Sequence, residues 1–437
     1  MSIFRKEYIQ KQARAMEDEL ISIRRTLHAH PELGTHEHKT DQLIIGYLSQ
    51  WGIDVQFPVA DTGIVAIVRG KAKEAGENSG AALPVVALRA DIDALPLQED
   101  KERPYCSKND GVMHACGHDA HTAIALGVAR FLKMHEQEWA GTVKFFFQPA
   151  EETCGGAERM VEAGCMENPT VDYVIGLHMM PTLEYGEVEL RYNDLNASSD
   201  EVDIIVHGVS THCSHPEDGV DAIVTAAAVV QNLQTVVSRS LSPLKNAVLS
   251  LGTVEGGTAH NIIADQVTLK GTLRTTEPQT RRALQERIRC IVEETCRAYG
   301  GRGELIIRPG YDALVNDNAI VDVIKDAAAR RLNLSHIHFK EAPSLGVEDF
   351  SFFLNKAQGA FYHLGCACKE KGITAPLHSP DFDIDERALV LGVELQTAIV
   401  GRLLAMPKKE TAAACKSSTP AEAGACSKRN PLENVGA

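Results

Sequence analysis

Residues 143–152 read Val-Lys-Phe-Phe-Phe-Gln-Pro-Ala-Glu-Glu, an apolar run that ends abruptly in polar residues. Short runs of aromatic and β-branched residues are typical of buried strands, and proline stops a strand because it has no N–H group for the ladder. Further runs of strand type alternate with stretches of helical spacing along the chain, at 64–68, 85–88, 119–135, 157–163 and 171–177. This alternation predicts an α/β fold with a mainly parallel sheet flanked by helices.

The pattern then changes to a strand, a long helix, two strands, a second long helix and a closing strand. This order predicts an α+β sandwich with helices on one face, inserted as a separate domain over 197–308. The first domain then comprises 1–196 and 309–406, and its first helix is predicted over 8–27. Residues 407–437 contain almost no large apolar side chains, so we expect a disordered tail that cannot offset its ordering entropy.

Length and charge limit the function classes. The 437 residues exceed the roughly 250–300 that one hydrophobic core holds, which agrees with two domains. A formal net charge of -15 argues against nucleic-acid and anionic-membrane partners, because both favour basic surfaces. No apolar run reaches the roughly 20 residues of a membrane span, and the charged start lacks the apolar core of a signal sequence. We therefore expect a cytoplasmic protein whose scattered cysteines are mostly reduced.

Metal-binding residue types gather at 113–121, where one cysteine and three histidines precede a predicted helix. Cys116 and His118 are two residues apart, so in an extended loop both can face one metal ion. The N-terminus of the following helix would also favour the thiolate form of Cys116. A polar loop with incidental histidines is the alternative for this segment taken alone.

Two carboxylates, Glu151 and Glu152, directly follow the strand that ends in the phenylalanines. Carboxylates in that position are costly unless they are paired or bound to a metal. Since neighbouring side chains of an extended backbone point in opposite directions, one can bind a metal while the other faces a bound water. A solvated turn is the alternative for the pair.

Two isolated histidines complete the set. His178 ends the strand predicted over 171–177, and His378 lies in the loop 376–380. Either one alone is more often a structural histidine. Together, the thiolate, imidazole and carboxylate donors suit two divalent transition-metal ions that share a bridge, with zinc, manganese, cobalt and nickel all compatible.

Asp93 follows a predicted strand and is a candidate supporting carboxylate. A carboxylate behind a metal ligand can hold the ligating imidazole in its correct tautomer. A structural salt bridge with Arg89 is the alternative for Asp93.

The chain resembles the zinc-peptidase-related amidohydrolases, the group of the hippurate hydrolases, indole-acetyl-amino-acid hydrolases and N-acyl-amino-acid amidohydrolases. This group is a branch of the aminoacylase and carboxypeptidase superfamily. The matching segments span most of residues 20–395 in the right order, at 24–34, 89–96, 114–121, 148–152, 176–178, 260–263, 348–350 and 377–379.

The resemblance implies a role for each of these side chains. Glu151 would be the general base and Asp93 a supporting carboxylate. The domain 197–308 would be a lid that mediates contacts in a homodimer or a dimer of dimers. Two divalent metal ions would be held by Cys116, His118, Glu152, His178 and His378.

Residues of the lid are also implied. The stretch 211–216 resembles the family segment whose histidine stabilises the oxyanion; His212 fits best by position, and His215 is the neighbouring candidate. Asn261 and Arg274 match positions that hold the substrate's carboxylate or backbone. A strand-end hydrogen bond or a surface charge is the alternative for each.

The resulting expectation is metal-dependent hydrolysis of the amide bond in N-acyl or N-aroyl amino acids, a small-molecule substrate class. A dipeptidase or carboxypeptidase with the same site is the main rival. A non-catalytic metal-binding protein is disfavoured, because such a protein would lack Glu151 or a ligand. The sequence leaves the acyl group and the metal open.

Overall fold

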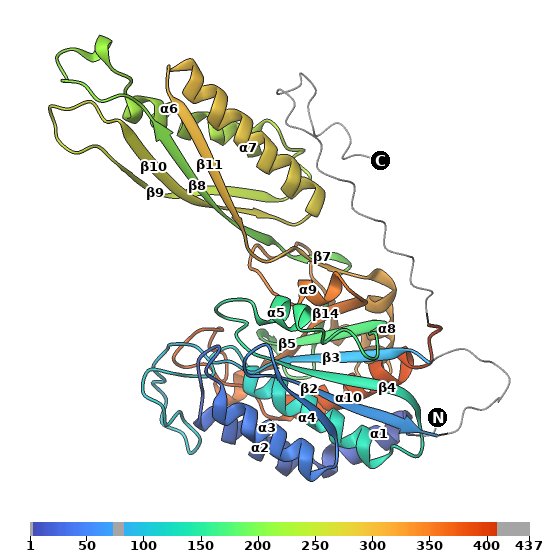
Figure 1. Ribbon diagram of the computed structural model, residues 1–437. Coiled ribbons are helices and arrows are strands. Elements are labelled where there is room, and N and C mark those ends of the chain that lie inside the picture. The colour runs from blue at the N-terminus through green and yellow to red at the C-terminus, as the bar shows by residue number, and fades with distance from the viewer. Residues whose placement is uncertain (1–2, 73–82, 409–437) are drawn as a thin grey trace. The chain divides into compact units, whose positions relative to one another are not determined.

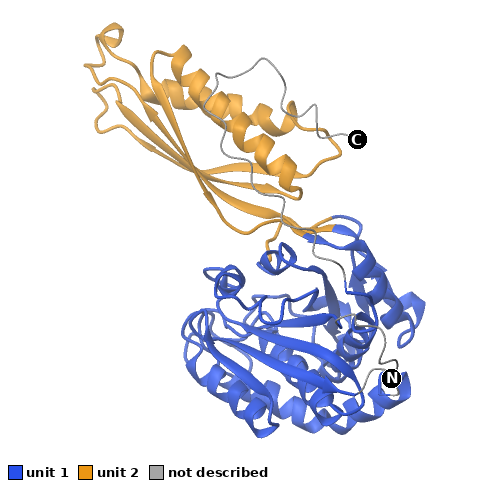
Figure 2. Cartoon of the chain, turned by 45° about the vertical axis from the view of Figure 1, so that its right-hand side comes forward, with its two compact units in different colours: residues 1–193, 315–342, 349–411 blue, residues 194–314, 343–348, 412–437 orange. Residues whose placement is uncertain are grey.

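The computed structural model describes residues 3–72 and 83–408. The chain forms two compact units (Figure 2). Among the described residues, unit 2 comprises Asp194–Leu314 and Pro343–Glu348, and unit 1 comprises the rest. The predicted inserted segment, 197–308, falls within unit 2. The tail predicted over 407–437 lies, beyond its first two residues, outside the described part of the chain.

Unit 1 is built on an eight-stranded sheet of order β1-β2-β4-β3-β5-β14-β6-β13 (Figure 1). The four central strands, β4, β3, β5 and β14, run parallel to one another. Strand β2 pairs antiparallel with β4 and with β1, and β6 pairs antiparallel with β14. The predicted α/β fold with a mainly parallel sheet is thereby confirmed. The strands are β1 (Asp54–Val59), β2 (Gly63–Lys71), β3 (Val85–Asp91), β4 (Ala140–Gln148), β5 (Tyr173–Glu184), β6 (Val188–Leu190), β13 (Ile337–Phe339) and β14 (Gln358–Ala367).

The central strands are largely buried because the layers on both faces of the sheet exclude water. All seven residues of β3 are buried, as are the last six of β4. Helix α4 packs against β3 and also against α2 and α10. The helices of unit 1 are α1 (Lys6–Ala15), α2 (Glu17–Ala29), α3 (His38–Gln50), α4 (His118–Met134), α5 (Gly156–Glu162), α8 (Asn318–Ala329), α9 (Ser351–Leu354) and α10 (Arg387–Leu403).

One predicted helix is wrong. The stretch 8–27 forms two helices, because Met16 leaves helical geometry with φ −99° and ψ 1°. The Met16 side chain is buried in the core of unit 1. That core is built largely from residues far away in the sequence, and the local pattern did not reveal the break.

Unit 2 has a core of its own between a four-stranded antiparallel sheet, of order β11-β8-β10-β9, and two long helices. Strand β8 alternates buried and more exposed residues, as expected when one sheet face is covered. Figure 1 shows both helices on the same face of the sheet. The elements are β8 (Ser198–His207), α6 (Ala222–Ser238), β9 (Ala247–Gly256), β10 (Gln266–Thr275), α7 (Pro278–Ala298) and β11 (Arg302–Pro309). A two-stranded sheet pairs β7 (Asn193–Asn196) with β12 (Leu314–Asn316).

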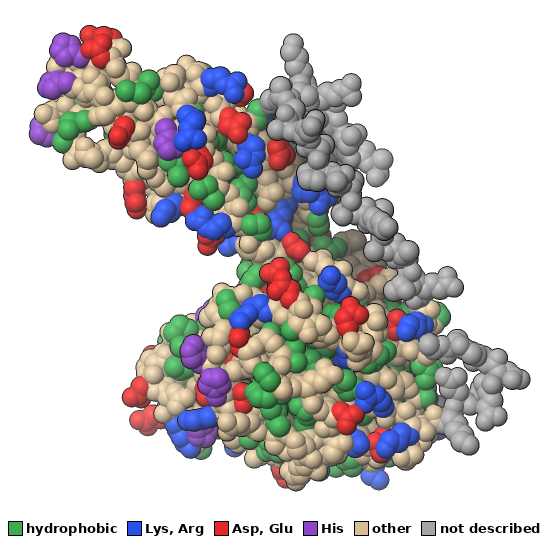
Figure 3. All heavy atoms as spheres, viewed as in Figure 1, with side chains coloured by type: hydrophobic (Ala, Val, Ile, Leu, Met, Phe, Trp, Pro, Cys, Tyr) green, Lys and Arg blue, Asp and Glu red, His purple; other side chains and the backbone are tan. Residues whose placement is uncertain are grey.

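The surface carries charged side chains of both signs, as the composition of the chain leads us to expect. On the face shown in Figure 3, positive and negative side chains are interspersed. None of the helices within the described ranges combines the length and the apolar character of a bilayer span.

A buried ion-pair network joins the helices beneath the sheet. Arg24 on α2 is fully buried; its Nε donates to Asp119 at 2.7 Å and its Nη2 donates to Asp383 at 3.0 Å. His28 Nδ1 also donates to Asp119, at 2.8 Å. Burial opposes the charge on Asp119, yet Arg24 holds the pKa of this carboxyl well below its usual range. The network therefore fixes the first turn of α4 against α2 and the segment before α10.

Replacing Arg24 by methionine should destabilise unit 1 strongly. The substitution removes the guanidinium from the buried carboxylate of Asp119, which keeps only His28 as a side-chain partner, and breaking a buried pair costs about 3–5 kcal/mol. Urea unfolding measures the loss. Arg25→Met is the matched control: its guanidinium is 44% exposed and binds Glu386, so a loss of about 1 kcal/mol or less is expected. Equal losses in the two variants would contradict this account.

Candidate metal centre

The five predicted ligands come from separate elements of unit 1. Cys116 and His118 lie at the start of α4, Glu152 follows β4, His178 lies in β5 and His378 precedes α10. Strands β3, β4 and β5 are parallel, so the segments that follow them lie at the same edge of the sheet. The prediction that His178 ends its strand is wrong, since β5 continues to Glu184.

The structure brings the ligand atoms of all five residues together. Cys116 Sγ lies 3.3 Å from His178 Nε2, and Glu152 Oε1 lies 3.2 Å from His378 Nε2 and 3.9 Å from His118 Nε2. The five residues form two groups of possible metal ligands. The first group is Cys116, His118 and His178, and the second is Cys116, Glu152 and His378. Within each group the ligand atoms lie within 4.8 Å of one another. Because Cys116 belongs to both groups, the arrangement suits two ions bridged by one thiolate.

Unsatisfied buried atoms show that these residues fit a metal. His118 Nε2 and Glu152 Oε1 are both buried and complete no hydrogen bond with any residue in the described ranges. Buried polar atoms nearly always have a partner, and a cation is the partner that an imidazole nitrogen and a carboxylate oxygen share.

The thiol of Cys116 points to the same conclusion. Burial raises the pKa of this thiol well above its ordinary value, with His118 acting against the shift. A thiolate at this position therefore needs a positive charge stronger than that of the neighbouring side chains. A bound divalent ion supplies such a charge and keeps a ligating cysteine deprotonated.

The backbone fixes which ring nitrogens face the centre. His118 Nδ1 donates to the carbonyl of Asp93 at 2.9 Å, and His178 Nδ1 donates to the carbonyl of Met179 at 2.7 Å. Each imidazole is thereby left with Nε2 directed at the ligand atoms of the centre. Such hydrogen bonds set the tautomer and the orientation of metal-binding histidines.

Asp93 lies where the predicted supporting carboxylate should lie. Its Oδ1 is 3.3 Å from His118 Nδ1, and its Oδ2 accepts the backbone N–H of Glu152 at 2.9 Å. Arg89, the residue of the alternative interpretation, donates to the carboxylates of Asp91 and Asp349.

The sequence reasoning missed a second pair behind the centre. His121 Nδ1 donates to Asp91 Oδ1 at 2.6 Å, and His121 Nε2 accepts the backbone N–H of Met179 at 2.8 Å. His121 therefore holds the backbone N–H of Met179, the residue whose carbonyl orients His178. The sequence did show a third histidine, His121, in the 113–121 segment. Its spacing alone does not distinguish a metal ligand from a residue that positions a ligand.

Glu37 is another supporting residue that was missed. This buried carboxylate accepts the backbone N–H of Ala150 at 2.9 Å and the hydroxyl of Thr62 at 2.5 Å. Ala150 has a φ of +55°, an unfavourable conformation for a residue with a Cβ, and it immediately precedes Glu151. Glu37 therefore stabilises the turn that directs the two glutamates.

Glu151 lies beside the centre without joining either group around Cys116. Its carboxylate oxygen lies within 4.8 Å of ligand atoms of His118 and Glu152. Glu151 and Glu152 are half-buried, and His378 is exposed, whereas Cys116 and His118 are buried. The centre is thus closed on the side of the sheet and open on the side of Glu151 and His378.

The predicted residues of unit 2 do not gather at one place in that unit. His212 pairs with Ile262, next to Asn261, beyond the end of the sheet where β10 starts. Arg274 pairs with Ser199 and Val248 near the other end of β10. Arg274 lies eight residue steps beyond the start of β10, which is about 26 Å in a strand. Their roles, and the choice between His212 and His215, stay predictions.

Comparison with known proteins places the chain among hydrolases. The model of "Peptidase family M20/M25/M40" matches residues 87–402. The N-acetylcysteine deacetylase of Bacillus subtilis is 38% identical over 379 residues, which are 86% of this chain and 95% of that protein. An IAA-amino acid hydrolase of Arabidopsis thaliana is 37% identical over 398 residues, 90% of this chain and 88% of that protein.

A solved structure gives the same result. It is a dinuclear metal-binding peptidase of the M20 family from Bacillus subtilis, with a TM-score of 0.76 and 34% identity, and the match covers 90% of this chain and 99% of that one. The predicted resemblance to zinc-peptidase-related amidohydrolases is confirmed. Fold, family match and relatives agree, and the chain belongs to peptidase family M20/M25/M40.

Proposed function

We propose that this M20-family hydrolase cleaves the amide bond of N-acyl amino acids. The observation that carries the proposal is the convergence of five ligand atoms next to Glu151, which is not needed to complete either ligand group. Two relatives support the substrate class, since one is named a deacetylase of N-acetylcysteine and the other a hydrolase of IAA-amino acids. Both names describe an acyl group joined to an amino acid.

The residues that would hold the metal ions are those of the two groups around Cys116. One ion would be bound by His118 and His178, and the other by Glu152 and His378, with Cys116 shared. A divalent ion in such a site polarises an amide carbonyl and lowers the pKa of a bound water to about 7. Zinc, manganese, cobalt and nickel all suit this donor set.

Glu151 would move the proton. Its neighbour Glu152 is fixed by the bond from its N–H to Asp93, so the backbone of the pair is held while the Glu151 carboxylate stays on the open side of the centre. The carboxylate would accept a proton from the attacking water and donate it to the leaving amine nitrogen. One group then acts first as base and then as acid.

A peptidase is the second candidate, because the solved M20 relative is described as one. Hydrolysis of a peptide needs the same water, the same ligands and the same proton carrier. The difference lies in what precedes the scissile bond: an uncharged acyl group in one case and a protonated amine in the other.

Glu151→Gln should abolish most of the turnover and leave the metal bound. The amide cannot accept the proton, and general acid–base catalysis is worth roughly 10²–10⁴-fold. Steady-state kinetics and elemental analysis on the same sample give both values. Glu162→Gln, an exposed position on α5, is the control and should behave as the unmodified enzyme. Near-normal activity in Glu151→Gln with metal bound would refute the assigned base.

Cys116→Ala should lower the metal content more than any other single cysteine substitution near the centre. It removes the one ligand that both groups share. Elemental analysis after dialysis gives the metal-to-protein ratio, and the exposed Cys154 provides the control as Cys154→Ala. A full metal complement in Cys116→Ala would show that the thiolate is not a ligand.

A paired substrate panel tests the substrate class. N-acetyl and N-benzoyl amino acids are compared with dipeptides that end in the same amino acids, after reconstitution with each candidate metal. We expect higher kcat/KM for the acyl derivatives. Faster cleavage of the dipeptides would reject the N-acyl proposal and favour the peptidase.

A further inference from the structure

A cavity of about 690 Å³ lies in unit 1, between the start of α1, the residues that follow α8 and the last turns of α10. We call it the basic cavity. Its lining is strongly positive, which is unexpected in a chain with a net charge of -15. The lining contains one carboxylate, that of Glu7, and five cationic side chains, those of Arg5, Lys6, Arg330, Arg331 and Arg402.

Arg331 contributes buried hydrogen-bond donors to the lining that lack a partner among the residues described. Its Nη1 donates to the carbonyl of Ala327 at 3.2 Å, whereas Nε and Nη2 are buried and have no hydrogen-bond partner among the residues described. Burial lowers the pKa of Arg331 to about 10; Glu394 opposes the shift and Arg402 adds to it. Buried donor groups of this kind are satisfied by an oxyanion, which the planar guanidinium binds through two parallel hydrogen bonds.

Most of the other cations in the lining are also available. Arg5, Lys6 and Arg330 form no ion pair within residues 3–72 and 83–408. Arg402 pairs with Asp326 at 3.2 Å. The positive charges therefore repel one another across the cavity, and a bound anion would relieve the part of that repulsion that the nearby carboxylates leave.

The N-terminus of α1 adds a further partial positive charge to the basic cavity. Arg5 is the N-cap residue of this ten-residue helix, and no side chain caps its first N–H groups. These groups and the helix dipole favour negative charge at the N-terminus. Phe4 fixes the position of this end, because its ring packs on Gly401 so closely that a Cβ there would lie 2.4 Å from it.

We propose that the basic cavity binds a phosphate group carried on a small organic molecule. Arginine forks and a helix N-terminus are the two protein groups that best match phosphate oxygens. The volume falls in the range of sites for organic ligands, about 300–1,000 Å³, and exceeds what inorganic phosphate alone would fill. Phe4 and Ala398 give the lining an apolar part against which the organic portion can pack.

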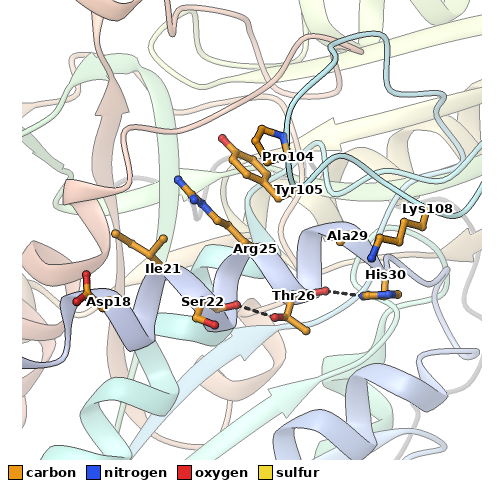
Figure 4. A pocket seen from close by; sticks show the side chains of 10 residues that line it. All are labelled: Asp18, Ile21, Ser22, Arg25, Thr26, Ala29, His30, Pro104, Tyr105 and Lys108. Atoms are coloured by element: carbon orange, nitrogen blue, oxygen red, sulfur yellow. Dashed lines mark hydrogen bonds between the residues drawn. The ribbon is translucent and has the colours of Figure 1, made fainter.

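A cavity on the outer face of α2, shown in Figure 4, illustrates the difference. Its volume is about 450 Å³, and its charged residues carry both signs. Arg25 in that cavity binds Glu386 through two nitrogens, at 2.8 and 2.6 Å. His30 is turned back to the carbonyl of Thr26. Arg25 and His30 there are already hydrogen-bonded, whereas Nε and Nη2 of Arg331 are not.

Two carboxylates oppose anion binding at the basic cavity. Glu7 is part of the lining, and Glu394 interacts electrostatically with Lys6 and Arg331. Burial raises the pKa of Glu394, so its negative charge is itself disfavoured in this position. Five cations against one carboxylate in the lining leave the cavity positive.

Isothermal titration of the metal-loaded full chain with adenosine monophosphate tests the proposal, at constant ionic strength set by sodium chloride. The unmodified protein should bind it, and Arg331→Met should weaken binding by about tenfold or more, since a charge-assisted hydrogen bond is lost. Arg330→Ser, at an exposed position, should also weaken binding and is not expected to disturb the fold. Arg239→Ser is the matched control, an exposed arginine of unit 2, and should bind normally.

Three results would overturn the proposal. One is unchanged affinity in both Arg331→Met and Arg330→Ser. Another is an equal loss in Arg239→Ser, which would show an effect of net charge alone. The third is equal affinity for inorganic phosphate, which would show that no organic portion is recognised. Amide hydrolysis by Arg330→Ser should stay normal, so the test does not depend on the proposed function.

Discussion

The candidate metal centre depends on the direction of two imidazole rings. His118 and His178 each use Nδ1 to donate to a backbone carbonyl, and each ring is thereby left with Nε2 toward Cys116 and Glu152. The residues around these two histidines also fix the positions of the ligands. His121 holds the N–H of Met179, the residue whose carbonyl orients His178, and Asp93 holds both His118 and the backbone of Glu152.

The sheet and its helices supply the rigid frame for these directions. Parallel strands β3, β4 and β5 deliver their following segments to one edge, and α4 begins at that edge with Cys116 and His118. The Arg24 network beneath fixes the first turn of α4 through Asp119, the residue after His118. A ligand pair at the start of a well-anchored helix needs little reorganisation to bind a cation.

Much of this arrangement was predictable because it follows from local pattern and residue type. The strand that ends at Gln148 and the donor types at Cys116 and Glu152 could be read directly from the sequence. The residues that hold the ligands and the helices in place could not be predicted in this way. Glu37 reaches Ala150 across more than a hundred residues, and the helix predicted over 8–27 is broken at Met16, which is buried in the core. Oligomeric state and cellular location stay predictions, as do the roles of His212, Asn261 and Arg274.

The order of the elements along the chain has a consequence for biosynthesis. Strand β14 pairs with β5 inside the large sheet, and both β14 and His378 follow the whole of unit 2 in sequence. Domains generally fold as they leave the ribosome. Unit 2, with its own core, is therefore complete while unit 1 still lacks an interior strand and one metal ligand. In a newly made chain, β5 would therefore present an unpaired edge until β14 has been synthesised.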